Sequence, residues 1–281
     1  MIGGVAMSSL VIGLIVAGVA IGVIFSCVKS FNKKKQQCTQ SFDDNKSGDH
    51  IDTVSANDNP LEATSMKHAS KMADVEIFMI KHNHITFTDI STIINENLKL
   101  SIDNRLIKNL SRSRKIFEEK INNSEDKYYG INTGFGGLHN IKINNDNLCY
   151  LQENLLKSHA CGVGDKVESR IVKLMILLKI ISLTKGYSGI KVETIERLLF
   201  FYNNNILPVV YQYGSLGASG DLVPLSHLSL PLIGLGEVEF ENKIHNTETI
   251  LRRFELSPLT LGAKEGLALI NGTQYMLASL I

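Results

Sequence analysis

The 281-residue sequence contains no tryptophan and only four cysteines. Those cysteines form no Cys-x-x-Cys pair, so neither a disulfide framework nor a zinc site is predicted, and the chain fits a reducing compartment. A formal net charge of +1 gives no reason to expect nucleic acid as a partner. No glycine-rich stretch has the spacing and lysine of a nucleotide-binding loop, and there is no internal repeat.

The first segment, residues 1–28, lacks charged side chains altogether and is rich in Val, Ile, Leu, Gly and Ala. About 20 apolar residues span a bilayer as a helix, so a transmembrane segment is predicted here. Four lysines follow within residues 29–35, which predicts that the rest of the chain is cytoplasmic. The alternative is a mis-assigned start, with translation beginning at Met66, Met72 or Met79.

The second segment, residues 29–74, has few apolar residues and no periodicity, whereas Asp, Asn, Ser, Lys and Thr are common. Such a composition cannot bury enough surface to offset the entropy of ordering, so a flexible polar linker is predicted. The main domain is predicted to cover residues 75–281.

Helical periodicity prevails in this domain, and the predicted fold class is mainly α with an N-terminal mixed α/β portion. Helices are predicted at 101–122, 144–157, 167–183, 192–202, after Asp221 as far as Gly234, and at 264–280. Short strands are predicted at 85–87 and 238–241.

Separated stretches of the domain combine glycines with side chains that can carry chemistry. They are YGINTGFG at 129–136, SHACGVG at 158–164, GASGDL at 217–222 and KEGLALINGTQ at 264–274. Each is weak alone, but together and in this order they resemble the aromatic amino-acid ammonia-lyase family. The resemblance runs from about residue 82 to residue 281. It implies the start of the helical core of the L-aspartase/ammonia-lyase-like fold, as the N-terminal half of a longer protein.

The resemblance implies that Ala218, Ser219 and Gly220 cyclise and lose water to form the electrophilic methylidene-imidazolone group (MIO), with no external cofactor. Loss of ammonia from an amino acid needs a strong electrophile, and ordinary side chains are nucleophiles. Glycine suits the attacking position because it tolerates strained backbone angles. Taken alone, the triplet favours an ordinary turn that caps the helix after Asp221, and the flanking motifs reverse that preference.

The remaining site residues are also assigned by resemblance. Tyr129 matches the catalytic base on a mobile glycine loop, and the alternative is an aromatic side chain that packs in a turn. Asn271 matches the side chain that hydrogen-bonds the electrophile or the substrate, and a buried partner is expected for it. The alternative for Asn271 is a satisfied core asparagine.

The pair Ser158 and His159 lies at the substrate-selecting position, and with Gln274 it resembles the histidine-specific members. The alternative for His159 is a structural histidine. His227 and the pair His82 and His84 have no match and are interpreted as structural, and no metal site is predicted because further ligands are lacking.

The leading functional hypothesis is therefore a histidine ammonia-lyase, which converts L-histidine to trans-urocanate and ammonia. The resemblance implies a homotetramer when the helical C-terminal half is supplied. Two alternatives stay open: an inactive membrane-tethered remnant or binding module, and a tyrosine or phenylalanine ammonia-lyase or aminomutase.

Overall fold

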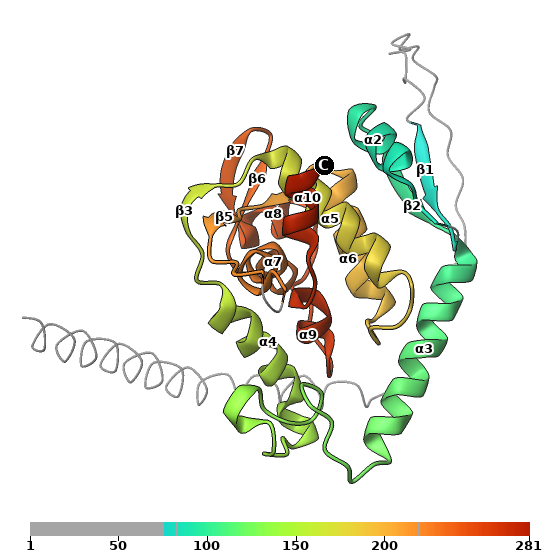
Figure 1. Cartoon of the computed structure of the whole chain (residues 1–281), viewed down its shortest axis with the longest axis vertical. Helices are drawn as coiled ribbons and strands as arrows, with labels where there is room; N and C mark the ends of the chain where they lie inside the picture. Colours follow the sequence, from blue (N-terminus) through green and yellow to red (C-terminus); the bar gives the residue numbers. More distant parts are fainter. Residues whose placement is uncertain (1–75, 83, 218–219) are drawn as a thin grey trace, which may run out of the picture. The chain divides into compact units, whose positions relative to one another are not determined.

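A computed structural model describes residues 76–281, apart from residues 83, 218 and 219 (Figure 1). The predicted transmembrane segment and the predicted linker thus lie outside the described residues. Within the described part of the chain, no helix combines the length and the apolar character needed to cross a membrane. Most of the regular structure is helical, which confirms the predicted fold class.

The N-terminal mixed portion is a pair of parallel strands joined by a helix. The strands are β1 (Ile77–Ile80) and β2 (Lys99–Ile102), and the helix between them is α2 (Phe87–Asn95). Ile80 and Leu100 are buried, so the pair contributes to the core.

The predicted strand at residues 85–87 is wrong, because these residues lead into α2. The Thr86 hydroxyl accepts a hydrogen bond from the Asp89 N–H at 3.2 Å, and the Asp89 carboxylate accepts one from the Thr86 N–H at 2.8 Å. This reciprocal capping satisfies two of the free N–H groups at the helix start. The capping signal here outweighs the β propensity of the isoleucine, threonine and phenylalanine.

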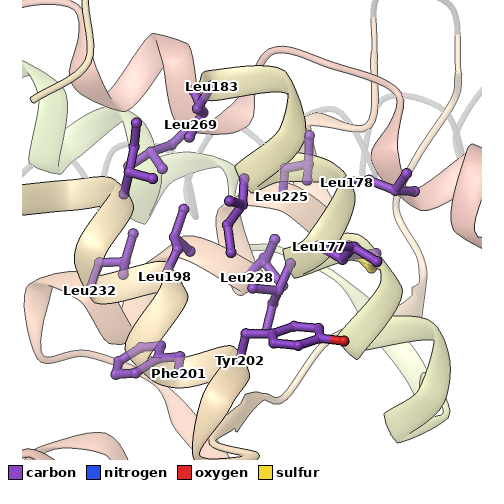
Figure 2. Close-up of a cluster of buried hydrophobic side chains, with 14 of the residues drawn as sticks. Leu177, Leu178, Leu183, Leu198, Phe201, Tyr202, Leu225, Leu228, Leu232 and Leu269 are labelled. Carbon is purple, nitrogen blue, oxygen red and sulfur yellow. The ribbon is translucent and has the colours of Figure 1, made fainter. Parts of the chain in front are cut away.

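The central helices follow the predicted periodicity closely. They are α3 (Asn104–Asn122), α4 (Leu148–His159), α5 (Ser169–Leu183) and α6 (Val192–Asn203). As expected, α5 is buried on most sides, and its leucines meet Leu198 and Phe201 of α6 in the core (Figure 2). One charged side chain of α5, Lys179, is buried among them, at 2% exposure.

Short strands frame these helices. β3 (Val163–Lys166) pairs antiparallel with β5 (Tyr211–Tyr213). A second sheet has the order β4-β6-β7, formed by β4 (Leu207–Pro208), β6 (Glu237–Phe240) and β7 (Lys243–Asn246). Of these strands, sequence periodicity predicted only β6, with bounds shifted by one residue. The others were missed because strands of two to four residues are too short to show alternation.

The C-terminal part contains four helices: α7 (Leu222–Ser229), α8 (Thr247–Arg253), α9 (Glu265–Ile270) and α10 (Gln274–Leu280). A 3₁₀ turn extends α7 to Gly234, whose φ of 77° ends it as predicted. The prediction of one helix over 264–280 is wrong, because α9 ends at Ile270 and α10 starts at Gln274. The Gly272 carbonyl between them accepts a hydrogen bond from the Asp221 N–H at 2.7 Å, which no continuous helix would permit.

Candidate active site

Gly220 lies directly against the backbone of Gly272, so the third motif and the Asn-Gly motif meet in space. A Cβ added to Gly220 would lie 2.9 Å from the Gly272 carbonyl oxygen and 3.2 Å from its nitrogen. Gly220 also has a φ of 112°, which only glycine adopts readily. Ala218 and Ser219 lie outside the described residues, so the structure locates one end of the predicted electrophile.

Asp221 is the fully buried residue that ties this junction together. Its N–H donates to the Gly272 carbonyl, while its carboxylate accepts from the Ser215 hydroxyl at 2.7 Å and from the Met276 N–H at 3.0 Å. One side chain thus holds the loop before the triplet and the first turn of α10. Sequence reasoning treated Asp221 only as the residue before a helix. The signal it missed was an ionisable residue adjoining the triplet.

The charge that faces Asp221 comes from α5. Burial lowers the pKa of Lys179 to about 7, and the attraction of Asp221 acts in the opposite direction. The Lys179 ammonium group donates to the Ala268 carbonyl of α9 at 3.5 Å. A buried carboxylate therefore adjoins Gly220 and a buried amine contacts α9, and neither was predicted.

Asn271 is exposed, which corrects the expectation of a buried partner. It forms the C-cap of α9, where its N–H donates to the Leu267 carbonyl at 2.9 Å. Because the helix breaks here, the asparagine side chain is not forced into the core. Gln274 is half-buried, and its Oε1 has no hydrogen-bond partner among the described residues.

His159 is the last residue of α4 and is half-buried, whereas Ser158 is exposed. The His159 Nδ1 lies 2.9 Å from the Leu155 carbonyl oxygen and 3.1 Å from the Ser158 hydroxyl. A carbonyl oxygen only accepts, so Nδ1 must carry the proton. In the neutral ring, Nε2 then has a lone pair that can accept a hydrogen bond.

Tyr129 lies on an open loop, with 58% of its surface exposed. Its hydroxyl oxygen is 3.5 Å from the Gly136 N–H, and its ring meets that of Phe135 edge-on with centroids 6.0 Å apart. The neighbouring Gly130 packs on α9, because a Cβ there would lie 2.7 Å from Leu267 Cδ2. The backbone next to Tyr129 is thus packed against α9, while the tyrosine side chain is largely exposed to solvent.

Helix α9 connects these parts. Besides the contact between Leu267 and Gly130, it packs against α4, where a Cβ on Gly266 would lie 2.7 Å from the Gln152 carbonyl oxygen. The Leu267 N–H also donates to Gln152 Oε1 at 3.2 Å. The Tyr129 loop, the helix that ends at His159 and the Gly220 junction therefore all contact one short helix or the turn that follows it.

Glu265, the first residue of α9, fixes that helix to α6. Its carboxylate is fully buried and accepts from the Thr194 hydroxyl at 2.7 Å, the Lys191 N–H at 3.1 Å and the Gly262 N–H at 2.7 Å. The Lys191 ammonium nitrogen lies 3.6 Å from the same group. The sequence motif contained Glu265, but nothing in its pattern indicated a structural anchor.

Comparison with known proteins identifies the family of the chain. Residues 85–281 match the aromatic amino acid lyase family, and the chain belongs to it. Histidine ammonia-lyase of Staphylococcus saprophyticus is 44% identical over 194 residues, which cover 69% of this chain and 39% of that protein.

Two solved structures have a similar fold. Histidine ammonia-lyase of Trypanosoma cruzi is 32% identical with a TM-score of 0.64, and the match covers 72% of this chain and 39% of that one. Tyrosine aminomutase of Streptomyces globisporus is 33% identical with a TM-score of 0.65, over 69% of this chain and 36% of its own. The chain thus spans less than half the length of each of these relatives.

Proposed function

We propose that the chain carries the electrophile-forming part of a histidine ammonia-lyase, which removes ammonia from L-histidine to give trans-urocanate. The observation that carries the proposal is the junction of Gly220, Asp221 and Gly272 next to the Ala218-Ser219 pair. The 44% identity to a histidine ammonia-lyase supports the choice of substrate. Because the chain spans 39% of that relative, the activity of the whole enzyme is part of the proposal.

The residues present fit the MIO group. Its formation requires the Gly220 nitrogen to bond to the Ala218 carbonyl carbon and Ser219 to lose its hydroxyl, so that two waters leave. The close approach of Gly272 leaves no room for a side chain at Gly220, and glycine is also the least hindered residue for this closure. When formed, the group supplies an electrophile that ordinary side chains lack.

His159 selects the substrate in this proposal. With the proton on Nδ1 bonded to the Leu155 carbonyl, Nε2 accepts an N–H from the imidazole of histidine. A tyrosine hydroxyl could also donate to Nε2, whereas phenylalanine has no ring donor. The proposal therefore predicts the preference histidine over tyrosine over phenylalanine.

Tyr129 serves as the base and Gln274 binds the substrate. The Gly136 nitrogen lies 3.5 Å from the Tyr129 hydroxyl oxygen, a contact that orients the phenol on its loop. Gln274 Oε1 is a buried acceptor without a partner among the described residues, which suits the amino group of the substrate. Asn271, exposed at the end of α9, donates on the electrophile side.

Intact-mass measurement on the full chain tests the electrophile. We expect a mass lower than that of the sequence by two waters, and the Ser219→Ala variant should lose none by this route. An unchanged mass in the wild-type chain, alone and after addition of the C-terminal part of a relative, would refute the assignment. Urocanate absorbance, compared with the products from tyrosine and phenylalanine, then tests the substrate.

A second candidate is an inactive chain or binding module. It is favoured by the exposure of Tyr129, a residue that a working base site would enclose. Formation of urocanate by the purified chain alone would exclude it. The homotetramer belongs to the first candidate, and size measurement after addition of the C-terminal part tests it.

Residues 1–28 are proposed to anchor a cytoplasmic lyase domain to a membrane. Their uncharged apolar sequence and the lysines after them support this. Cell fractionation with a carbonate wash is the test. Recovery of the intact chain in the soluble fraction would refute the anchor and leave the lyase assignment unaffected.

A further inference from the structure

His227, the sixth residue of α7, contacts the segment that leaves α4. Its Nε2 accepts a hydrogen bond from the Gly162 N–H at 3.0 Å. Its ring meets that of Tyr211 edge-on, with centroids 5.1 Å apart and an interplanar angle of 76°. The imidazole is thus held between β5 and the residues that precede β3.

The hydrogen bond fixes the state of the ring. A backbone N–H only donates, so Nε2 must have a free lone pair and Nδ1 must carry the proton. An imidazolium has no acceptor, and the bond therefore exists only while His227 is neutral. Burial lowers the pKa of His227, which favours the same neutral form.

Gly162 is shaped for this contact. A Cβ at Gly162 would lie 3.1 Å from His227 Nε2, 3.2 Å from its Cδ2 and 3.3 Å from Tyr211 Cβ. The backbone therefore passes directly against the imidazole, and any larger residue would push it away. The His227 and Tyr211 side chains therefore take up part of the space that a side chain at Gly162 would need.

The contact links the two halves of the candidate site. Gly162 is three residues beyond His159, and the intervening Cys161 N–H donates to the His159 carbonyl at 2.9 Å. At the other side, α7 begins two residues after Gly220. One helix therefore carries the electrophile loop at its start and the anchor of the His159 segment in its interior.

We propose that His227 is a positioning residue that sets the place of His159 relative to Gly220 by holding the Gly162 amide. The inference rests on the proposed function in assigning His159 to the substrate. The anchor itself does not depend on that assignment, because it is defined by contacts within the chain.

The test is hydrogen–deuterium exchange on the full chain, read for the peptide that contains Gly162. His227→Leu removes the acceptor, and we expect exchange at this peptide about fivefold faster, the effect of one lost hydrogen bond. His227→Gln offers an amide oxygen at a similar reach and should restore most of the protection. His82→Leu, at an exposed histidine, is the matched control and should change nothing.

Equal protection of the peptide in wild type and His227→Leu would overturn the anchor. If His227→Leu does not fold by circular dichroism, His227→Gln and Gly162→Ala decide the question. Protection lost in Gly162→Ala but kept in His227→Gln supports the anchor, and full protection in Gly162→Ala overturns it.

L-Histidine binding, measured by calorimetry on the full chain, separates the anchor from the proposed function. Binding weakened about fivefold or more in His227→Leu and rescued in His227→Gln supports the positioning role. Unchanged binding in His227→Leu overturns it. If the wild-type chain, with the C-terminal part of a relative added, binds no histidine while the exchange contrast is present, the proposed function has failed and the anchor stands.

Discussion

The junction around Asp221 and the loop around Tyr129 are two parts of one candidate site with opposite construction. At the junction, the fully buried Asp221 carboxylate accepts hydrogen bonds from Ser215 and Met276, and the backbone N–H of Asp221 donates to the Gly272 carbonyl. In the loop, the tyrosine ring is 58% exposed and its hydroxyl meets one N–H at 3.5 Å. The Gly220 side of the candidate site is therefore held by bonds within this chain, whereas the Tyr129 side is open.

The two regions differ in how much they must rearrange when a substrate binds. Preorganised donors and acceptors reduce the reorganisation needed for chemistry, whereas an open loop can close over a substrate. Helix α9 carries both arrangements, since Leu267 supports Gly130 and the turn after Ile270 supports Gly220. We therefore expect changes at the junction to affect folding and changes in the loop to affect activity.

The largest effect is expected for Asp221→Ala. It leaves the Ser215 hydroxyl and the Met276 N–H without their acceptor and Lys179 without its counter-charge. We expect the free energy of unfolding to fall by about 4 kcal/mol, because each buried donor left without an acceptor costs about 1–3 kcal/mol. Urea denaturation measures it, with the exposed Asp165→Ala as control. A loss equal to that of the control would contradict the proposed junction.

The next effect is a pH dependence at Lys179, whose pKa burial lowers to about 7 in the folded chain. Between that value and the ordinary lysine pKa, the unfolded chain binds the proton and the folded chain does not. The free energy of unfolding therefore rises with pH across this window.

The variant Lys179→Met should remove this pH dependence. We expect the wild type to gain on the order of 3 kcal/mol relative to the variant between pH 7 and pH 10. Parallel stability curves for the two proteins over that range would show that Lys179 keeps its proton in the folded chain.

A smaller effect compares one glycine from each region. Gly220 and Gly136 both have positive φ. A Cβ at Gly220 would meet the Gly272 carbonyl oxygen at 2.9 Å, whereas a Cβ at Gly136 would have no atom of the described residues within 4 Å. Gly136→Ala should cost about 1 kcal/mol from backbone strain alone. Gly220→Ala should cost about 2 kcal/mol more because of the added clash. Thermal unfolding of both variants measures the difference, and equal costs would argue against close packing at Gly220.

The smallest effect on stability is expected for Tyr129→Phe. An exposed hydroxyl contributes little, so unfolding should change by less than about 0.5 kcal/mol. In any preparation that forms urocanate, the same variant should lose activity at least about 100-fold if the phenol is the base. A large loss of stability, or full activity, would show that the two regions do not differ as described.

Sequence periodicity was sufficient for the long helices, because α3 to α6 repeat their apolar residues over several turns. Periodicity failed for short elements and for elements whose ends depend on contacts between residues far apart in the sequence. The α9–α10 break depends on Asp221, more than 50 residues away in the chain, and no local pattern reports such a contact. The same distance explains why Asn271 was wrongly expected to be buried.

The motifs alone determined the family, the triplet at 218–220, and the candidate residues Tyr129, His159 and Gln274, because chemistry restricts which residue types can occur together in that order. Tertiary structure alone decided that Asp221 is buried between Ser215 and α10, that Lys179 is buried against α9, and that His227 accepts a hydrogen bond from Gly162. These roles arise from burial and from hydrogen bonds between separate helices. A residue type in the sequence does not reveal its burial, and burial is what turns an ordinary lysine, aspartate or histidine into an anchor.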